Sequence, residues 1–411
     1  MIRQTIAFRV FSAAILANLF VMGSNRIYLD HAATSWPKPD SVYEAVQRCM
    51  RDLGAPAGRS SYTEANEVER LVSATRRSLS RLLGADHPRQ IIFASNGSDA
   101  LNLAIHGILE PGDHVITSQA EHNSILRPLA HQAATNDVTV SYVACGEHGI
   151  VSPDEVRTAI QDRTRLIALT HASNVTGAIQ PAEAVGQLAR EHGIVFLLDA
   201  AQTLGHQPVD VKQLQVDLLA GSGHKGLLGP LGTGLLYVGS GTETQLAPSK
   251  QGGTGTDSHS ELQPDSLPEK YEVGNLNVPA IAGWGAAVEF LSQRGLQEIQ
   301  VQLCELTTRL LSGLRGIPGI QIFGPVGSEH RVPVVSISLP GVDPQEAALM
   351  LDSAYQIQVR SGLHCAPRMH RCLETDSRGG TIRLSLGVMN TGDQVDTTVN
   401  ALKEIATSAA S

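Results

Sequence analysis

Short apolar runs that alternate with helical segments are the feature that most restricts the fold of this chain. Val68, Leu71, Val72 and Leu79 repeat at the spacing of one helix face, and residues 91–94 then form a short apolar run. Further strand-like runs lie at 114–117, 138–143, 165–170, 194–198, 216–220 and 233–238. Such alternation is typical of a mostly parallel sheet covered by helices on both faces, so we expect an α/β fold.

The pattern changes after about residue 280, where the chain becomes α+β in character. The expected elements are a long helical stretch at about 279–315 and strand-like runs near 319–323, 333–339 and 381–385, followed by a terminal helix. A chain of 411 residues is also too long for one typical domain. We therefore expect a large domain over residues 25–285 and a smaller one over residues 286–411.

Local signals mark two helix starts and one long loop. Ser152, Pro153 and Glu155 have the spacing of a capping box with proline at the first helical position. Asp343, just before Pro344, predicts the start of another helix. The glycine-rich stretch at about 248–270 has no clear period, and a long loop in a compact enzyme is often functional.

Residues 1–24 fit neither domain. Residues 7–22 are mostly apolar, and Arg3 and Arg9 lie near the front, as in a weak secretory signal. No Ala-x-Ala cleavage site is evident, and the apolar run is too short and interrupted to cross a bilayer. Because Met22 lies just before the first globular pattern, we interpret the segment as an extension upstream of the start normally used. A signal or anchor and an additional docked helix are the alternatives.

Charge and cysteine content exclude several classes of partner. The 31 Lys and Arg residues against 40 Asp and Glu give a net charge of −9 without a basic block. Nucleic acid and anionic membranes are therefore not expected as partners. The 5 cysteines are scattered and form no CxxC pair, which argues against a disulfide framework and is typical of a reducing compartment. We expect a cytoplasmic protein.

Lys225 and Asp199 are the first candidates for chemistry. Lys225 lies in a Gly-rich segment between two apolar runs, and Asp199 closes the apolar run at 195–198. A lysine that can form a Schiff base and an aspartate that can keep a pyridine nitrogen protonated are the minimal requirements of pyridoxal phosphate chemistry. A surface lysine and a helix-capping aspartate are the alternatives. We favour pyridoxal phosphate as the cofactor, because suitable side chains follow the neighbouring runs as well.

A phosphate site is predicted where Gly97 and Ser98 open a helix after the run at 91–94. Backbone N–H groups and the helix dipole at such a start can hold a phosphate dianion, although a plain N-cap would have the same sequence. Ser222 and His224 flank the lysine and can donate to the same phosphate. Ligands of open α/β sheets bind beyond the carboxyl ends of the strands, so we expect these groups to lie together.

Four more side chains suit the rest of such a site. His122 can stack on the pyridine ring and move protons, although it can also be an ordinary loop histidine. Asn174 and Gln202 carry amides suited to the ring oxygen or to a substrate carboxylate. Arg383, in a predicted strand of the second domain, can bind an α-carboxylate through two hydrogen bonds, or it is a surface arginine.

Cys365 is a candidate nucleophile, because its Gly, Pro and polar neighbours predict a loop in which a thiol can be exposed and reactive. An inert thiol in the core is the common alternative. His364, His370 and Cys372 lie nearby and suggest a zinc cluster as a third reading. Their spacing matches no standard zinc pattern, so we expect no metal.

Together these motifs resemble the class V aminotransferase family, and within it the cysteine desulfurases. The resemblance covers residues 27–405. Its markers are Tyr28-Leu29-Asp30-His31-Ala32-Ala33-Thr34, residues 95–102, Glu121-His122, Ser173-Asn174-Val175-Thr176-Gly177, Asp199-Ala200-Ala201-Gln202 and Ser222-Gly223-His224-Lys225. The segment from Arg360 to Ala366 is similar to that of the group II, SufS-like desulfurases and selenocysteine lyases.

The resemblance implies a homodimer of PLP fold type I that transfers sulfur from L-cysteine to an acceptor protein. L-Selenocysteine, with transfer of selenium, is the alternative substrate. Such enzymes mobilise sulfur for iron–sulfur cluster assembly. By this resemblance Lys225 carries the cofactor, His122 stacks on it and Asp199 pairs with its ring nitrogen. Gln202 and Asn174 flank the ring oxygen and substrate, and Arg383 binds the carboxylate. Cys365 takes the sulfur as a persulfide and alanine is released.

Three positions depart from the family pattern. His31 stands where the family usually has asparagine, and Gly97-Ser98 replaces phosphate-site threonines, which removes one hydroxyl. Asn275 stands near the family's Gly-Thr, whose threonine reaches the partner subunit's phosphate; the amide of Asn275 can still donate. A selenocysteine lyase, another class V aminotransferase or β-lyase, and a non-catalytic PLP-binding scaffold are the alternative functions.

Overall fold

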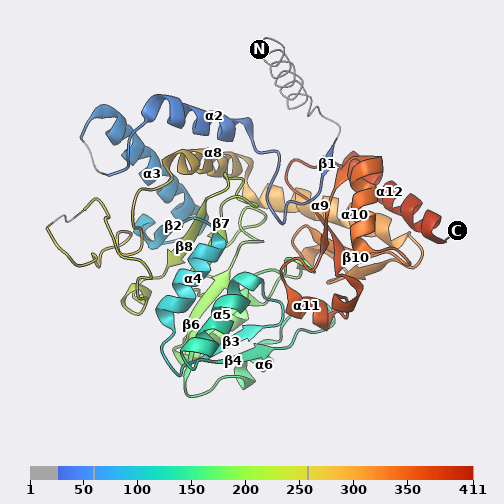
Figure 1. Ribbon diagram of the computed structural model, residues 1–411, viewed down its shortest axis with the longest axis horizontal. Coiled ribbons are helices and arrows are strands. Elements are labelled where there is room, and N and C mark those ends of the chain that lie inside the picture. The colour runs from blue at the N-terminus through green and yellow to red at the C-terminus, as the bar shows by residue number, and fades with distance from the viewer. Residues whose placement is uncertain (1–25, 59–60, 257–258, 411) are drawn as a thin grey trace, which may run out of the picture.

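A computed structural model of the protein describes residues 26–58, 61–256 and 259–410 (Figure 1). The extension expected over residues 1–24 lies outside them. In the described part of the chain, none of the helices has the length and apolar character needed to cross a membrane.

A seven-stranded sheet forms the centre of the larger part of the molecule, in the order β2-β8-β7-β6-β5-β3-β4. The strands from β4 to β7 are parallel, whereas β8 is antiparallel to both of its neighbours. The mostly parallel sheet expected from the apolar runs is therefore confirmed. The strands are β2 (Ile91–Ala94), β3 (His114–Ser118), β4 (Thr139–Val143), β5 (Thr164–Thr170), β6 (Val195–Asp199), β7 (Leu218–Ser222) and β8 (Gly234–Val238).

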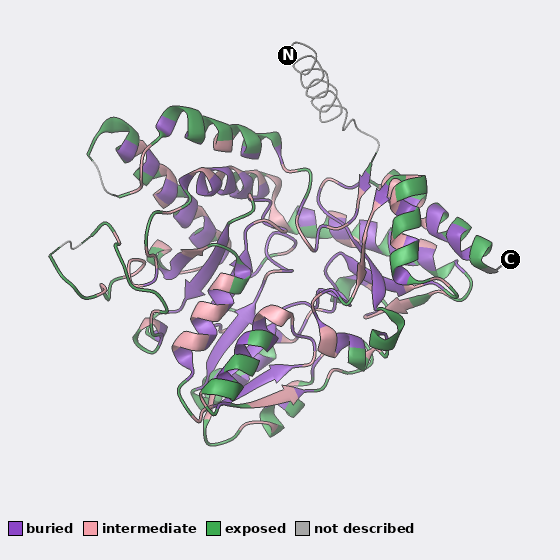
Figure 2. Ribbon diagram, in the orientation of Figure 1, coloured by how far each residue is buried: buried purple, intermediate pink, exposed green. Residues whose placement is uncertain are grey.

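Helices cover both faces of this sheet, because successive strand residues point to opposite sides. Leu197 packs in a core with α4 (Gly97–Ile108) and α5 (Asn123–Thr135), whereas Phe196 and Leu198 pack in a second core on the other face. The helices that contribute to this second core are α2 (Asp40–Arg48), α3 (Thr63–Leu82), α6 (Pro153–Thr158), α7 (Ala182–His192), α8 (Val278–Arg294) and α9 (Leu296–Arg315). Figure 2 shows the buried sheet between helices whose outer faces are exposed.

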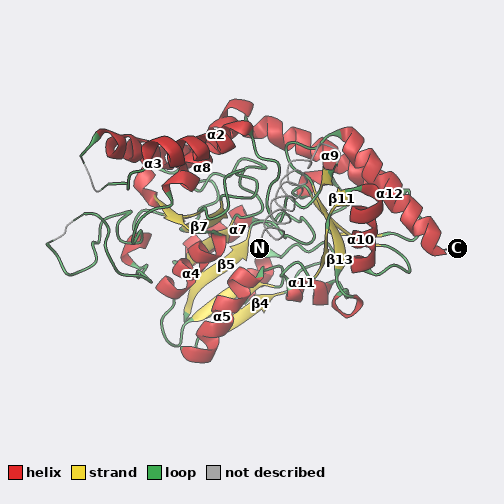
Figure 3. Ribbon diagram, turned by 45° about the horizontal axis from the view of Figure 1, so that its top comes forward, coloured by secondary structure: helices red, strands yellow, loops and turns green. Residues whose placement is uncertain are grey.

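The C-terminal part has its own antiparallel sheet, in the order β12-β13-β10-β9. Its core joins the second half of α9 to the helices α10 and α12, and it also includes Ile27 and Leu29 from the start of the described chain. Figure 3 shows α10 and α12 beside β13. The elements are β9 (Gln321–Phe323), β10 (Val334–Ser338), α10 (Pro344–Tyr355), β11 (Ile357–Gln358), β12 (Arg360–Gly362), α11 (Pro367–Cys372), β13 (Thr381–Ser385) and α12 (Gly392–Ala410).

Strand β1 (Ile27–Tyr28) links the first residues of the described chain to this C-terminal part, because it pairs in parallel with β11. Five short helical turns complete the described chain: η1 (Cys49–Leu53), η2 (Pro88–Gln90), η3 (Thr242–Thr244), η4 (Ser328–His330) and η5 (Asp376–Arg378).

Two local expectations need correction and one is confirmed. The helical stretch at 279–315 is two helices, because Gly295 adopts a φ of 82° that ends α8 before α9 begins. Ser152 precedes α6, but its side chain makes no capping bond, so the predicted capping box is not formed. Asp343 does cap α10: its Oδ1 accepts the N–H of Gln345 at 2.8 Å and of Glu346 at 3.3 Å.

Candidate active site

A cavity of about 600 Å³ lies at the carboxyl ends of the central strands and faces the C-terminal part. Thr170, Asp199 and Ser222, which end β5, β6 and β7, line one side, and Arg360 and Arg383 line the other. The structure brings most of the sequence-predicted site residues to this cavity, namely Gly97, Ser98, His122, Asn174, Asp199, Gln202, Ser222, His224, Lys225 and Arg383. Cys365 and Asn275 do not line it.

The start of α4 forms a close cradle in the cavity wall. Asn96 caps the helix by accepting the N–H of Asp99 at 2.9 Å, which leaves Gly97 and Ser98 at the first two helical positions. A Cβ atom on Gly97 would lie 2.6 Å from Oγ of Ser222, so a larger residue would fill the space between them. The first N–H groups of a helix have no partner within the helix and attract anions. The cradle therefore suits a phosphate group.

Lys225 and Asp199 both line the cavity, and their charges affect each other. Burial lowers the pKa of Lys225 to about 8, although the charge of Asp199 acts in the opposite direction. Burial raises the pKa of Asp199, whose side chain is 5% exposed and accepts the N–H of Ala201 at 3.0 Å. A lysine amine that loses its proton near neutral pH can react with an aldehyde.

His122 is held as a neutral ring at the start of α5. Its Nδ1 accepts the N–H of Ser124 at 3.0 Å and contacts the Ser124 hydroxyl at 2.9 Å. Burial, followed by the positive charges of Lys225 and Arg360, lowers the pKa of His122 to about 3. A neutral imidazole here can stack on a ring and can accept a proton.

Arg383 and the amides of Asn174 and Gln202 also line the cavity. Arg383, only 1% exposed, donates to the carboxylate of Asp30 at 2.7 Å and to the carbonyl of Asn174 at 3.2 Å. The Asn174 amide donates to the carbonyl of His364 at 2.6 Å, and the Gln202 amide donates to the carbonyl of Ala32 at 3.1 Å. These bonds fix the orientation of the groups that face the cavity.

The turn that carries Cys365 is anchored rather than free. Asn123 donates its N–H to the Cys365 carbonyl at 2.8 Å, and both His364 and Cys365 have positive φ angles, 47° and 58°. The half-buried thiol accepts from Nη2 of Arg360 at 3.5 Å. Cys365 lines an adjoining cavity of about 500 Å³, which shares Ser98, His122 and Ser124 with the first. The thiol thus lies beside the cavity of Lys225.

The side chains of the suggested zinc cluster turn to separate partners. His364 contacts the Thr381 hydroxyl at 3.0 Å, His370 contacts the Thr375 hydroxyl at 2.8 Å, and Cys372 donates to Gln119. Among the described residues, no three His, Cys, Asp or Glu side chains are grouped as metal ligands.

Asn275 is exposed in the loop before α8 and does not line the cavity. Contact with a partner subunit's phosphate stays a prediction.

Sequence reasoning missed three charged residues at the site. Arg360 lines the cavity, Asp30 holds Arg383, and Glu121 lies fully buried behind the wall, where it accepts the N–H of Thr170 at 2.9 Å. Burial raises the pKa of Glu121 to about 8. All three residues lie in the segments that carry the resemblance, and that position was the available signal.

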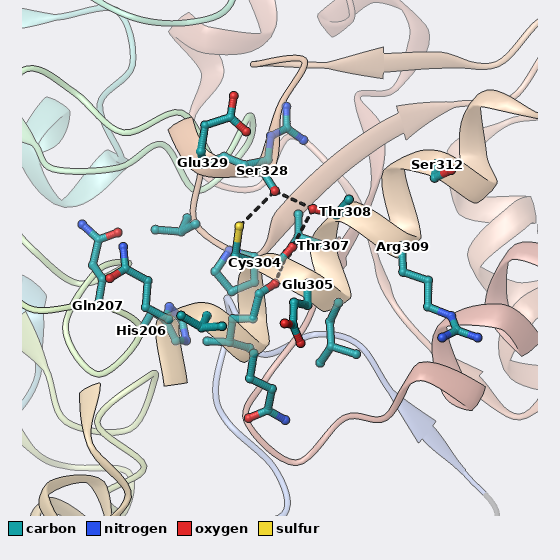
Figure 4. Close-up of a pocket in the computed structure, with 18 of the residues that line it drawn as sticks. His206, Gln207, Cys304, Glu305, Thr307, Thr308, Arg309, Ser312, Ser328 and Glu329 are labelled. Atoms are coloured by element: carbon teal, nitrogen blue, oxygen red, sulfur yellow. Dashed lines mark hydrogen bonds between the residues drawn. The ribbon is translucent and has the colours of Figure 1, made fainter. Parts of the chain in front are cut away.

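A larger cavity of about 1070 Å³ lies along α9 (Figure 4), but it suits a phosphate cofactor less well. Its lining includes the carboxylates of Glu305 and Glu329, and the guanidinium of Arg309 is paired with Asp396. Nη2 of Arg331, also in the lining, donates to the carbonyls of Phe323 and Pro325. We favour the smaller cavity for the cofactor, because it has a free helix start and the lysine.

Unpaired polar atoms around the smaller cavity also indicate a ligand. Gln202 Oε1, His224 Nδ1 and Arg383 Nε are buried and have no hydrogen-bond partner among the described residues. Buried polar groups are usually satisfied, so a polar molecule in the cavity would complete them. Pyridoxal phosphate with an amino acid substrate has acceptors and donors of the required kinds.

Comparisons with known proteins agree with this chemistry. The family model described as class V aminotransferase matches residues 27–398. A probable cysteine desulfurase from Methanothermobacter thermautotrophicus is 32% identical over 93% of this chain and 95% of that protein. Cysteine desulfurase IscS from Methanosarcina thermophila is 32% identical over 92% of this chain and 91% of that protein.

Two solved structures have the same fold. The apo structure of a cysteine desulfurase from Thermococcus onnurineus NA1 superimposes with a TM-score of 0.86 at 30% identity, covering 93% of this chain and 95% of that one. The cysteine desulfurase CsdA from Escherichia coli superimposes with a TM-score of 0.83 at 30% identity, with the same coverage.

Proposed function

This chain belongs to the class V aminotransferase family, and we propose that it is a pyridoxal-phosphate-dependent cysteine desulfurase that takes sulfur from L-cysteine onto Cys365. Relatives and solved structures named as cysteine desulfurases, at 32% and 30% identity over 93% of the chain, support this function. They do not distinguish the group II subtype, which rests on the short segment around Cys365.

One observation carries the proposal: an anchored thiol adjoins a cavity that holds a lysine and an aspartate suited to the cofactor. Transamination and simple elimination need Lys225 and Asp199 but no thiol. The bond from Asn123 to Cys365 and the contact with Arg360 hold the sulfur beside His122. Such placement favours sulfur transfer over the other reactions of this scaffold.

The cofactor, when bound, withdraws electrons from the substrate's α-carbon and so weakens the bond between Cβ and sulfur. Lys225 would hold it covalently, and Gly97, Ser98, Ser222 and His224 would receive its phosphate. Asp199 would pair with the ring nitrogen, and the neutral ring of His122 would lie against it. Gln202 and Asn174 would bond its ring oxygen and the substrate, while Arg383 would bind the substrate's α-carboxylate.

Sulfur transfer uses Cys365 as the nucleophile. Its thiolate forms a bond with the substrate sulfur as the bond between that sulfur and Cβ breaks. The electron pair stays with Cβ, which takes a proton, so that L-cysteine and one thiol give L-alanine and one persulfide. The guanidinium of Arg360 donates to the sulfur at 3.5 Å and helps to fix the direction in which it points.

We include a homodimer and a sulfur-acceptor protein in this proposal. Tyr43 and Met50, seven positions apart near α2, are 47% and 68% exposed, which suits a face that a second copy covers.

Cys365 must pass its sulfur on before the next turnover, so an acceptor has to reach it. All five cysteines are free thiols, which fits the cytoplasmic location expected from the sequence.

The test is turnover of the purified holoenzyme. We expect incubation with L-cysteine to yield L-alanine and protein-bound persulfide, with turnover increased by a thiol reductant. A parallel incubation with L-selenocysteine identifies a selenocysteine lyase if only that substrate is turned over. Formation of pyruvate or another keto acid from L-cysteine, in place of alanine, would contradict the proposal.

A further inference from the structure

We propose that the adjoining cavity beside Cys365 is the entrance for the sulfur acceptor, and that Arg127 favours an acceptor protein whose cysteine is flanked by acidic side chains. This inference rests on the proposed function, because it takes Cys365 as the thiol that carries the sulfur. It adds the kind of partner that the site accepts and a residue that selects it.

The adjoining cavity connects the thiol with the surface of the molecule. It has a volume of about 500 Å³, and the half-buried Cys365 lies in its lining together with His122, which also lines the cavity of Lys225. Arg127 and His131, both in α5, line the adjoining cavity too, and both are exposed. An acceptor can therefore approach the thiol past Arg127 while the first cavity holds the cofactor.

The adjoining cavity is lined by one cationic side chain and by no acid. Its described lining contains Arg127 and three histidines, but no aspartate or glutamate. Among the residues that the structure describes, Arg127 forms no ion pair. Helix α5 has no acidic residue, and the one acid of α4, Asp99, is paired with Lys250 at 2.9 Å. The charge of Arg127 is thus available to an incoming partner.

Two histidines of the lining form the wall opposite the thiol's own segment. The rings of His106 in α4 and His131 in α5 meet edge to face, with centroids 5.7 Å apart, and the amide of Gln132 contacts Nδ1 of His106 at 2.6 Å. Burial, followed by the neighbouring His131, lowers the pKa of His106. Because its pKa is lowered, His106 adds no positive charge at neutral pH, which leaves Arg127 as the cation of this wall.

The charge of Arg127 acts on the site itself. Burial lowers the pKa of His122 to about 3, and Arg127 is among the positive charges that add to this effect. A charge that acts on His122 also acts on an anion in the cavity that His122 lines. The whole chain, by contrast, has a net charge of −9, so a general attraction would favour a positively charged acceptor. A preference for an acidic acceptor would therefore arise locally.

Sulfur transfer to the acceptor is an exchange between a thiol and a persulfide. The acceptor thiolate forms a bond with the outer sulfur of the Cys365 persulfide as the bond between the two persulfide sulfurs breaks. The electron pair stays on Cys365, which takes a proton, and the acceptor leaves as a persulfide. One thiol and one persulfide thus give one persulfide and one thiol, without an oxidant or reductant. A carboxylate beside the accepting sulfur would be attracted to Arg127 during this approach.

The experiment uses two short peptides in which either glutamates or lysines flank one cysteine. Each is reacted with holoenzyme that has been loaded with sulfur from L-cysteine, and the peptide persulfide is quantified by mass spectrometry. We expect Arg127→Gln to lower the ratio of the glutamate-peptide rate to the lysine-peptide rate about threefold, which is the size of effect that one exposed charge pair has. Raising the salt to ~1 M should remove most of this difference, because the Debye length falls to ~3 Å.

Two further variants isolate the charge of Arg127 from other effects. Arg127→Lys keeps the charge and should keep the ratio of the wild type. Arg157→Gln removes an exposed arginine of α6 that does not line the cavity, so it changes the net charge equally and should leave the ratio unchanged. Arg360, which donates to the Cys365 sulfur, is positive as well, so the comparison of variants, rather than the preference of the wild type, identifies the role of Arg127.

Alkylation of Cys365 in holoenzyme without bound sulfur gives a second measurement that needs no desulfuration. We expect Arg127→Gln to lower the ratio of the iodoacetate rate to the iodoacetamide rate about threefold, because only iodoacetate is charged. An unchanged ratio in this variant, with the peptides or with the two reagents, would overturn the proposal. Failure to form a persulfide would contradict the proposed function, whereas a normal persulfide with an unchanged peptide ratio would contradict only the role of Arg127.

Discussion

The guanidinium of Arg360 lies 3.5 Å from the sulfur of Cys365, at the turn between β12 and α11. This contact fixes the direction in which the sulfur points. We expect Arg360→Ala to slow alkylation of Cys365 by iodoacetamide about two- to twelvefold at neutral pH, since the loss of one ordinary hydrogen bond corresponds to about 0.5–1.5 kcal/mol. Arg371→Ala removes an exposed charge of α11 and is the control. Equal rates in Arg360→Ala and wild type would show that the contact has no such effect.

The pH dependence of cofactor binding reports on Lys225. Its pKa, lowered to about 8 by burial, means that the amine is protonated below this pH and neutral above it. Only the neutral amine reacts with an aldehyde, so the rate of cofactor uptake by the apoprotein should rise with pH and level off above about 8. The charge of Asp199 raises this pKa, so Asp199→Asn should move the midpoint to lower pH. The change in absorbance after the apoprotein is mixed with the cofactor gives the rate of uptake. A rate that continues to rise above pH 10 would contradict the account.

Gly97 leaves the space in which we propose that the phosphate binds. Gly97→Ala would place a Cβ atom 2.6 Å from Oγ of Ser222, so the hydroxyl must move out of the cradle. Overpacking of this kind costs about 1–3 kcal/mol, which should appear as weaker cofactor binding in equilibrium dialysis. At Gly146 the nearest atom to an added Cβ is 3.6 Å away, so Gly146→Ala serves as the control. An unchanged affinity of Gly97→Ala for the cofactor would show that the phosphate does not bind at this position.

Asn275 is expected to act across the dimer. If its amide donates to the partner subunit's phosphate, Asn275→Ala should weaken cofactor retention by ~1.5–3 kcal/mol, the contribution of a hydrogen bond to a charged group. Asn275→Thr should retain the cofactor about as well as the wild type. Dialysis of the dimer against buffer, followed by absorbance, measures retention. Equal retention in the alanine variant would disprove the contact.

Much of the fold could be predicted from the sequence, because buried parallel strands leave continuous apolar runs. The run at 91–94 is β2 to the residue, and Asp199 ends β6 as expected from its position. Helix ends were harder to predict: Gly295 divides one expected helix into two, because a single glycine with positive φ is enough to end it.

The candidate site was predictable where a residue ends a strand or lies a few positions after one. Asp199 ends β6, Lys225 lies shortly after β7 and His122 lies shortly after β3, and the sheet topology brings them together. Contacts that join distant parts of the chain were not predictable, because no local pattern encodes them. Asp30 and Arg383 are 353 positions apart, and Asn174 meets the carbonyl of His364 across 190 positions.

The central claim is that Cys365 takes the sulfur, and locating the persulfide tests it most directly. The holoenzyme is incubated with L-cysteine, and alanine and the modified peptide are quantified, the latter by mass spectrometry. We predict persulfide on Cys365, and in Cys365→Ala a normal cofactor spectrum with loss of the persulfide and of most alanine. Cys304→Ala, which removes a thiol that contacts Ser328 along the other cavity, should behave like the wild type. Near-normal alanine release by Cys365→Ala would contradict the account.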